Sequence, residues 1–302
     1  MYFAQHKPEN LVTYQNKEEF YKNYKDSTLD LPETKYFSVK NEKNLPDMNY
    51  PIVLKPTNVI KYNHISFPGK KKIYKLQNKI ELRECVEMIK KSGYDDTVIL
   101  QEFIEGDDTY MFDCVVYVDR NNRVTHQTFA QVGLQDQNAG AVGNLTCIIN
   151  GICTFKNAPV EETKKKIREF FESHEYSGFA NLDIKYDAKS NTFKILEINA
   201  RQGRGSYYVA ACGYNLVKVM VDDLILNKNS SFNDITKEQL LTYVPKAIIK
   251  KYIKNKTLRE KAVELWKTRV NPLEYKLDNK LRRKYIIKKR QLAYFKAYKN
   301  PY

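Results

Sequence analysis

The chain has 302 residues, of which 42% are hydrophobic and 29% are charged, a composition typical of one large globular domain or two small ones. This composition excludes a disordered chain, a membrane span of ~18 apolar residues and an N-terminal signal peptide, so we expect a cytoplasmic protein. The net charge of +15 favours an anionic partner: a nucleotide, a nucleic acid, an anionic lipid or an acidic metabolite.

The first third of the chain predicts alternating helices and strands. Apolar residues in "ELRECVEMIKKSG" recur at the i, i+3, i+4, i+7 positions of an amphipathic helix, and Gly93 is placed to end it. The runs rich in β-branched and aromatic residues predict strands. The expected elements are a short helix at 16–26, strands at 34–39, 50–58 and 95–104, and the amphipathic helix at 81–93.

The remainder predicts an antiparallel sheet with helices packed on it. Residues 110–132 predict two strands around the turn "DRNNR", and a hairpin follows with strands at 179–187 and 192–199. Helices are expected at 160–174 and 206–226, the second as one helix or two, and from about residue 228 onward the chain is expected to be helical and basic. This order favours an α+β fold of two lobes over a doubly wound parallel sheet.

The hairpin predicts a site for a metal ion. Side chains alternate between the two faces of a strand, so Asn181 and Asp183 share one face, and Glu197 and Asn199 share a face of the partner strand. Carboxylates that face each other repel unless a cation lies between them, and oxygen ligands without His or Cys favour Mg²⁺ or Mn²⁺. The alternative is a hairpin whose polar residues only face water.

The residues after the hairpin, "NARQGRG", predict an anion site. Arginine binds carboxylate or phosphate with a bidentate fork, and Arg201 and Arg204 flank Gly203, where a backbone without a side chain permits close approach. The segment matches neither common glycine-rich nucleotide-binding pattern. A basic turn with a capping glycine is the alternative interpretation.

Three stretches, "YPIVLKP", "VILQEFIEGDD" and "NLDIKYDAKSNTFKILEINARQGRGS", occur in this order. Together they resemble the ATP-grasp superfamily of carboxylate–amine ligases, and within it the D-aspartate ligase type, which adds D-aspartate to the lysine of a peptidoglycan precursor. The resemblance implies an ATP- and Mg²⁺-dependent enzyme that joins a carboxylate to an amine through an acyl phosphate. Its ATP would lie between two α+β lobes, the smaller acting as a lid.

The resemblance also implies roles for single residues. Lys17 and Lys55 would contact the nucleotide, with Lys55 on the α- and β-phosphates, and "SFPGKKKIYKL" would be the flexible phosphate loop. Gln101 to Ile104 would form the hinge on adenine, with backbone groups of Glu102 and Ile104 at the ring edge. Asp108 would bind the ribose, with Asp107 as an equal alternative.

The metal ligands implied by the resemblance are Asp183, Glu197 and Asn199, and Arg201 and Arg204 match side chains near the acyl phosphate. The sequence departs from the pattern at Asn181, where many members carry a phosphate-binding arginine; Arg204 or a loop lysine would compensate. The segment "AGAVGNL", residues 139–145, is interpreted as a turn or as a substrate loop.

The resemblance divides the chain into four parts. Ligases of this type usually begin with a separate domain of on the order of a hundred residues, whereas here about 16 residues precede Lys17. We therefore expect that preceding domain to be missing. The expected parts are its remnant at 1–16, the small lobe at 17–100, the large lobe with the metal site at 101–227, and a basic helical extension at 228–302.

Two alternative functions remain. The first is ligation of another amino acid or peptide by the same fold, and the second is a non-catalytic basic protein that binds nucleic acid or an anionic membrane. No nucleic-acid-binding module is recognisable, so we expect no nucleic acid partner. The C-terminal "LRRKYIIKKRQLAYFKAYKNPY" mixes Lys and Arg with apolar residues, which favours peripheral contact with an anionic membrane. We expect the tail to pack on the large lobe through Leu258, Ala262, Leu265 and Trp266.

Overall fold

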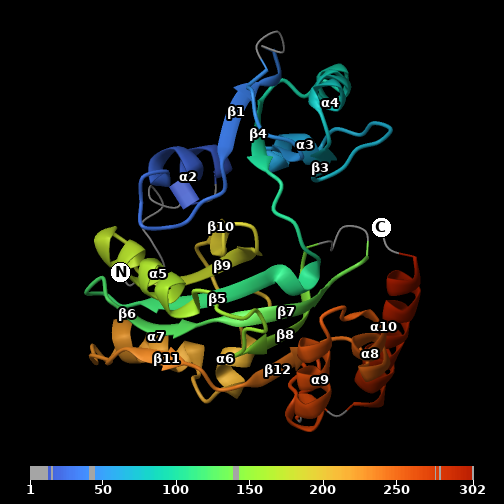
Figure 1. Ribbon diagram of the computed structural model, residues 1–302. Coiled ribbons are helices and arrows are strands. Elements are labelled where there is room, and N and C mark those ends of the chain that lie inside the picture. The colour runs from blue at the N-terminus through green and yellow to red at the C-terminus, as the bar shows by residue number, and fades with distance from the viewer. Residues whose placement is uncertain are drawn as a thin grey trace.

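The computed structural model describes residues 13–14, 16–40, 45–138, 143–275, 277–278 and 280–300. The described elements form a small lobe, drawn in blue and teal at the top of Figure 1, and a large lobe below it. Most of the predicted N-terminal remnant, and residues 139–142 of the predicted turn or substrate loop, lie outside the described residues.

The small lobe is a four-stranded antiparallel sheet in the order β1-β4-β2-β3, with helices α3 and α4 beside it. Leu82, Val86 and Ile89 of α4 are buried against sheet residues, as the apolar spacing predicted. The elements are β1 (Thr34–Ser38), β2 (Ile52–Pro56), α3 (Val59–Asn63), β3 (Tyr74–Leu76), α4 (Lys79–Lys91) and β4 (Thr97–Glu102). Helix α4 begins two residues earlier than predicted because the Asn78 side chain caps its first turn.

The large lobe is built on a sheet with the order β10-β9-β5-β7-β8-β12, and β6 pairs with both β5 and β11. Its strands are β5 (Met111–Val118), β6 (Val124–Thr128), β7 (Ala130–Gln135), β8 (Leu145–Asn150), β9 (Gly178–Asp187), β10 (Thr192–Asn199), β11 (Asn233–Ile235) and β12 (Gln239–Thr242). The predicted hairpin is confirmed as β9 and β10, which match the expected bounds to within one residue.

Two predictions about strands are wrong. Residues 124–132 do not form one strand, because the chain changes partner at Phe129: β6 pairs with β5 and β11, and β7 continues between β5 and β8. The chain is also not helical throughout from residue 228, because β11 and β12 add to the large sheet. Both strands depend on pairing with distant residues, which local periodicity does not reveal.

Helices α2 (Lys17–Tyr24) and α5 (Val160–Ser173) cover one face of the large sheet. Phe170 and Phe171 of α5 are fully buried, as predicted, and Phe20 and Tyr24 of α2 join the same core. Helix α2 lies within the range expected for the small lobe. Its buried aromatic side chains nevertheless pack with the large sheet, so by its contacts α2 belongs to the large lobe.

The opposite face is covered by α6 (Tyr207–Ala211), α7 (Leu216–Leu224), α8 (Lys246–Tyr252), α9 (Lys256–Glu264), η3 (Leu265–Thr268) and α10 (Leu281–Lys299) (Figure 1). Leu258 and Ala262 are fully buried in this second core, and Leu265 and Trp266 pack against it. The predicted packing of the basic tail on the large lobe is therefore confirmed. Within the described ranges, every helix is too short or too polar to span a lipid bilayer.

Leu258→Ala should lower the free energy of unfolding by about 2 kcal/mol or more, because it leaves a cavity in the second core. Urea denaturation followed by circular dichroism measures the change. Leu277→Ala is the matched control, because Leu277 is exposed and its truncation should cost less than about 0.5 kcal/mol. Equal stability of the two variants would mean that α9 does not pack on the sheet.

Candidate functional site

The register of β9 and β10 places polar residues opposite one another. Glu197 pairs with Asp183 and Asn199 pairs with Asn181, so the expected shared face is present. The ladder shifts between Ile195 and Glu197, which marks a β-bulge. The Tyr21 hydroxyl of α2 donates to the carbonyl oxygen of Leu196 at 2.6 Å and fixes the bulged backbone.

A third carboxylate, which sequence reasoning missed, lies on the same face of the sheet. Asp113 of β5 pairs with Asp183 and is almost fully buried. Its carboxylate accepts from Asn181 Nδ2 at 2.5 Å and from the Tyr208 hydroxyl at 2.8 Å. Burial raises the pKa of Asp113 to about 6, although both hydrogen bonds oppose the rise. A lone acid in the apolar run "MFDCVVYV" was the signal available in the sequence.

Electrostatics on this face favour a bound cation. Burial, followed by repulsion from Asp113 and Glu197, raises the pKa of Asp183 to about 7. Burial also acts to raise the pKa of Glu197, but the Lys17 ammonium, with Nζ 2.9 Å from Oε1, outweighs it and the pKa is lowered. Crowded carboxylates become easier to ionise when further positive charge arrives.

The donor set fits a hard divalent cation. Asp183, Glu197 and Asn199 offer only oxygen atoms, and Mg²⁺ typically takes one or two protein carboxylates and completes its shell with phosphate and water. In the part of the chain that the structure describes, no three His, Cys, Asp or Glu side chains are grouped as a self-sufficient metal site. The predicted ligands would therefore hold the ion together with a phosphate ligand rather than alone.

The predicted lysines lie beside the carboxylates. Lys55 of β2 donates to Gln101 Oε1 at 2.8 Å, and Gln101 Nε2 donates in turn to Thr34 Oγ1 at 2.9 Å. Gln101 is thus a buried residue of β4 that orients Lys55 through its side chain. Burial, followed by the charge of Lys17, lowers the pKa of Lys55 to about 8. Within the described residues the Lys55 ammonium forms no ion pair, so it is well suited to bind a phosphate.

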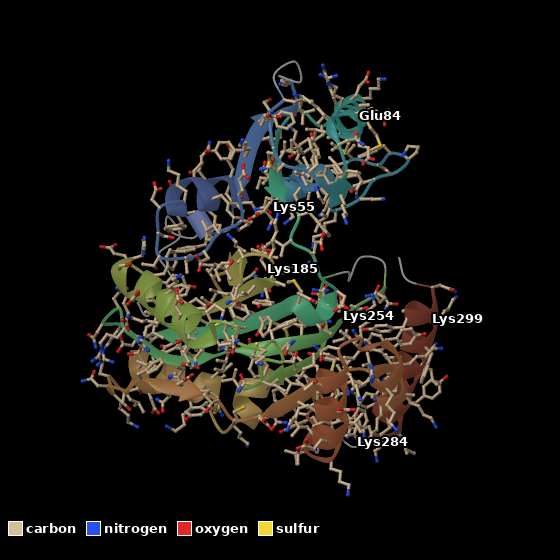
Figure 2. The ribbon with its side chains drawn as sticks, in the orientation of Figure 1. Lys55, Glu84, Lys185, Lys254, Lys284 and Lys299 are labelled. Carbon is tan, nitrogen blue, oxygen red and sulfur yellow. The ribbon has the colours of Figure 1, made fainter. Side chains whose placement is uncertain are left out.

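The predicted phosphate loop supplies another charge. Lys72 acts electrostatically on both Lys55 and Glu197, so this loop lysine lies close enough to influence the site. Figure 2 shows Lys55 on the small lobe and Lys185 on the large lobe along the facing sides of the two lobes. The Lys185 ammonium donates to the carbonyl oxygen of Gly106 at 3.1 Å and lies 5.5 Å from the centre of the Phe103 ring.

The hinge residues connect the lobes. The Glu102 carboxylate accepts from the backbone N–H of Glu33 at 2.9 Å and lies 3.8 Å from Lys194 Nζ. The Phe103 N–H bonds to the carbonyl oxygen of Pro51, whereas the next amide along, that of Ile104, has no acceptor among the described residues. A free N–H directly after a strand is the kind of group that reads the edge of a planar ring.

Asp108 and Asp107 have different roles. Asp107 accepts from Thr109 N at 2.8 Å and Thr109 Oγ1 at 2.6 Å, so it caps η2 (Asp108–Tyr110). Among the described residues, Asp108 accepts one hydrogen bond, from Gln135 N at 2.8 Å. Burial raises the pKa of Asp108, and the charges of Lys185 and Lys254 oppose the rise. Of the two carboxylates, that of Asp108 accepts fewer hydrogen bonds from the described residues and is the more available to a ligand.

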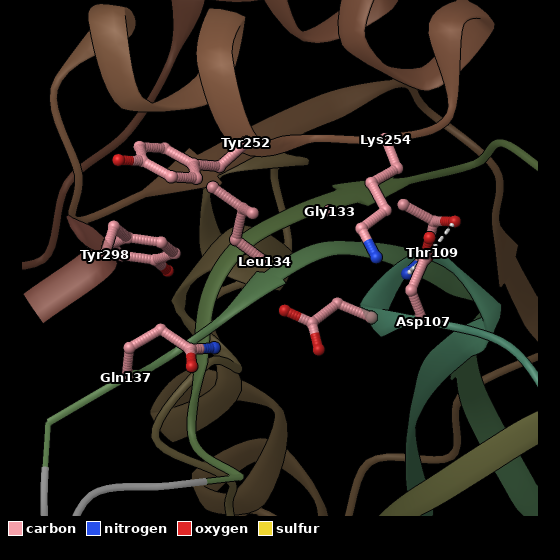
Figure 3. A pocket seen from close by; sticks show the side chains of 9 residues that line it. Asp107, Thr109, Gly133, Leu134, Gln137, Tyr252, Lys254 and Tyr298 are labelled. Atoms are coloured by element: carbon pink, nitrogen blue, oxygen red, sulfur yellow. Dashed lines mark hydrogen bonds between the residues drawn. The ribbon is translucent and has the colours of Figure 1, made fainter. Parts of the chain in front are cut away.

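A cavity of about 290 Å³ opens beside Asp108 (Figure 3). It is lined by η2, by Gly133 and Leu134 of β7, by Lys254 in the segment between α8 and α9, and by Tyr298 of α10. Because Lys185 of the interlobe face also acts on Asp108, the cavity adjoins the hinge region. The role of Asp108 in ribose binding stays a prediction.

The two arginines diverge. Arg201 Nη2 donates to Asn199 Oδ1 at 3.2 Å, and its charge acts on Asp183, so Arg201 lies at the carboxylate face. Arg204 Nη2 lies 3.8 Å from Asp136 Oδ2, and its guanidinium is 5.4 Å from the centre of the Tyr243 ring. The structure thus brings Arg201 to the predicted metal ligands and holds Arg204 at the far side of the loop.

The loop that carries these arginines folds back onto β9. A Cβ at Gly203 would lie 1.6 Å from Asn181 Oδ1, so only glycine permits this approach. Asn181 stands where the resemblance implied an arginine; its amide donates to Asp113 and its oxygen lies against Gly203. Asn181 therefore supports the loop, and the positive charge at the site comes from Lys17, Lys55, Lys72 and Arg201.

The comparisons with known proteins agree with this architecture. No family model matches the chain. The chain is 32% identical over 265 residues to a D-aspartate ligase of Enterococcus faecium (strain Aus0004), and the alignment covers 83% of this chain and 61% of that protein. The chain thus spans less than two thirds of that relative's length.

Two solved structures share the fold. One is the biotin carboxylase domain of 2-oxoglutarate carboxylase from Hydrogenobacter thermophilus, in complex with MgADP and bicarbonate. It aligns with a TM-score of 0.58 and 16% identity, and the alignment covers 78% of this chain and 51% of that chain. Phosphoribosylglycinamide synthetase from Anaerococcus prevotii aligns with a TM-score of 0.55, 18% identity and coverage of 79% and 57%. By sequence the chain is therefore a homologue of a D-aspartate ligase, and by fold it is similar to the ATP-grasp enzymes.

Proposed function

We propose that the chain is an ATP-dependent carboxylate–amine ligase that requires Mg²⁺ or Mn²⁺. The proposal rests on one observation: Lys17, Lys55 and Arg201 converge on the face formed by Asp183, Glu197 and Asn199. That face combines sites for a divalent cation and for phosphate, which a phosphoryl transfer requires. The likeness to a D-aspartate ligase supports D-aspartate as the acid. The amine proposed from the sequence resemblance is the lysine of a peptidoglycan precursor.

In the proposed reaction, an oxygen of the substrate carboxylate attacks the γ-phosphorus of ATP, which forms an acyl phosphate and releases ADP. The amine then attacks the acyl carbon, phosphate leaves, the nitrogen loses a proton, and an amide bond remains. Each turnover thus consumes one ATP and gives one ADP, one phosphate and one amide. The reaction uses cytoplasmic ATP, so we place the chain in the cytoplasm.

The residues divide this work. Lys55 and Lys17 would bind the phosphates of ATP. Backbone groups of Glu102 and Ile104 would bind adenine, and Asp108 would bind the ribose. Arg201 would hold the phosphoryl group on the acid, where negative charge is greatest. Asp183, Glu197 and Asn199 would hold the divalent cation, which neutralises charge on the phosphates when bound. Arg204 would reach the acyl phosphate only after releasing Asp136 and the Tyr243 ring.

A screen of ADP release tests the proposed function. The chain would be supplied with MgATP, a peptidoglycan precursor that carries a free lysine amine, and one D- or L-amino acid at a time. We expect ADP release that requires both the acid and the amine, with the amide product detected by mass spectrometry. ADP release with a different acid and amine would support ligase activity but show that the proposed substrates are wrong. No release with any pair would refute ligase activity.

Lys55→Ala should weaken ATP binding by about 1.5–3 kcal/mol, which is roughly 10- to 150-fold in Kd, because a charge-assisted hydrogen bond to phosphate is lost. Isothermal calorimetry measures the change directly. Lys79→Ala is the control, since Lys79 lies on the small lobe outside the site and makes only a 4.0 Å contact with Asp47. An unchanged Kd for Lys55→Ala would show that Lys55 does not contact the nucleotide.

The pH dependence gives a second test of Lys55. Its pKa in the free protein is lowered to about 8, and a bound phosphate would raise it again. ATP binding should therefore take up a proton above pH 8, and affinity should fall as the pH rises from there. Calorimetry in two buffers of different ionisation enthalpy detects the uptake, which Lys55→Ala should remove. Uptake that persists in that variant would assign the proton to another group.

A further inference from the structure

Helix α10 (Leu281–Lys299) has an unpartnered outer face. Tyr294, Ala297 and Tyr298 are buried on the large lobe, and the Tyr298 hydroxyl donates to the carbonyl oxygen of Gln135 at 2.6 Å. On the opposite side four apolar residues are exposed: Leu281 (84%), Tyr285 (66%), Leu292 (60%) and Phe295 (43%). The helix is therefore apolar on two sides, and only one of them is covered.

The four exposed residues form a single stripe, here named the outer stripe. Because an α-helix turns by about 100° per residue, they lie within a sector of about 80° on the helix surface. Tyr275 and Leu277, in the segment that leads into α10, are also exposed. Scattered exposed apolar residues need no explanation, but an aligned set along 19 residues of one helix does.

Positive charge flanks the outer stripe on both sides. Arg282, Lys289 and Lys296 follow one edge of it and Lys284 lies at the other, while Lys288 lies within the stripe, between Tyr285 and Leu292. The helix contains no acidic residue, and these five cations form no ion pair within the described ranges. Figure 2 shows Lys284 and Lys299 near the two ends of α10, at the outer edge of the molecule.

We propose that α10 docks parallel to an anionic lipid surface through the outer stripe. A mostly apolar stripe with cations along and beside it fits an interfacial helix, whose apolar side chains enter the headgroup boundary while its cations extend to lipid phosphates. Each cation near an anionic leaflet adds to the attraction, and the excess positive charge of the helix complements that surface. The inference is independent of the proposed ligase reaction, because it uses no residue of that site.

Two other occupants fit less well. A second copy that packed α10 against α10 would place two rows of uncompensated cations against each other, and like charges at an interface oppose association. The phosphates of a nucleic acid would pair with the cations, but the apolar side chains of the outer stripe would remain exposed to water or phosphate. A lipid surface is the partner that accommodates both the charges and the apolar residues.

Co-sedimentation with vesicles tests the proposal on the full chain, without ATP or substrates. One set of vesicles contains equal parts of phosphatidylglycerol and phosphatidylcholine, and the other contains phosphatidylcholine alone. We expect binding at low salt to the anionic vesicles only. Leu292→Ser with Phe295→Ser should lower the partition coefficient by about tenfold or more. Lys284→Gln with Lys288→Gln should lower it by about fivefold for each lysine removed.

Ile60→Ser with Ile80→Ser is the matched control, since both isoleucines are exposed on the small lobe and binding should be unchanged. Circular dichroism of each variant confirms that it folds. No binding of the parent to anionic vesicles would overturn the proposal, and so would equal binding of the Leu292 and Phe295 variant. Light scattering that shows a dimer broken by that variant would assign the stripe to a second copy instead.

Discussion

Glu197→Gln is expected to lose magnesium-dependent ATP binding and to reduce ligase turnover by at least about 10²-fold. The substitution keeps the shape of the side chain but removes the charge that holds the divalent cation. It also removes the partner of Lys17, whose Nζ lies 2.9 Å from Oε1 of Glu197. Calorimetric titration with ATP, in the presence and absence of Mg²⁺, separates the metal-dependent part of the binding.

Glu84→Gln is the control for this experiment, because Glu84 is exposed on α4 of the small lobe (Figure 2) and should leave both measurements unchanged. A melting temperature close to that of the parent would show that Glu197→Gln retains the fold. If that variant then binds MgATP as tightly as the parent does, the carboxylate face of β9 and β10 is not the metal site.

Arg201→Ala is expected to lower kcat by about 10²–10³, the range for loss of one electrostatic donor to a transition state, while the Kd for ATP changes little. Arg201 contacts Asn199 and acts on Asp183, so it lies where the acyl phosphate would form. An interaction made mainly in the transition state lowers kcat and kcat/KM together. Steady-state ADP release measures both constants.

Two further variants sharpen the result. Arg201→Lys should recover only part of the rate, because lysine lacks the bidentate fork. Arg204→Ala should lower kcat by less than Arg201→Ala, since Arg204 is engaged with Asp136 and Tyr243. Full activity of Arg201→Ala would make this arginine a structural residue, and a larger loss in Arg204→Ala would move the acyl phosphate to that side chain.

The local parts of the fold could be predicted from the sequence. The hairpin of β9 and β10 followed from alternation within one short segment, and its register put Asp183 opposite Glu197 as expected. Helices α4 and α5 followed from the spacing of their apolar residues. In each case the information lies within about fifteen residues of chain, where periodicity is informative.

The non-local parts could not be predicted. Asp113 joins the site because β5 pairs with β9, about seventy residues further along the chain, and no local pattern indicates that pairing. The support that Gln101 gives to Lys55 likewise depends on β2 and β4 being neighbours. The different directions of Arg201 and Arg204, only three residues apart, follow from the fold of the loop between them.

In the proposed reaction this site phosphorylates a carboxylate and transfers the resulting acyl group to an amine. The most direct test uses D-aspartate labelled with heavy oxygen in its side-chain and α-carboxylates, together with MgATP and a peptidoglycan precursor. If an acyl phosphate forms, one labelled oxygen should appear in each phosphate released, with one ADP and one amide formed. Phosphate that carries no label, released at the same rate with or without the acid and the amine, would show ATP hydrolysis alone and contradict the account.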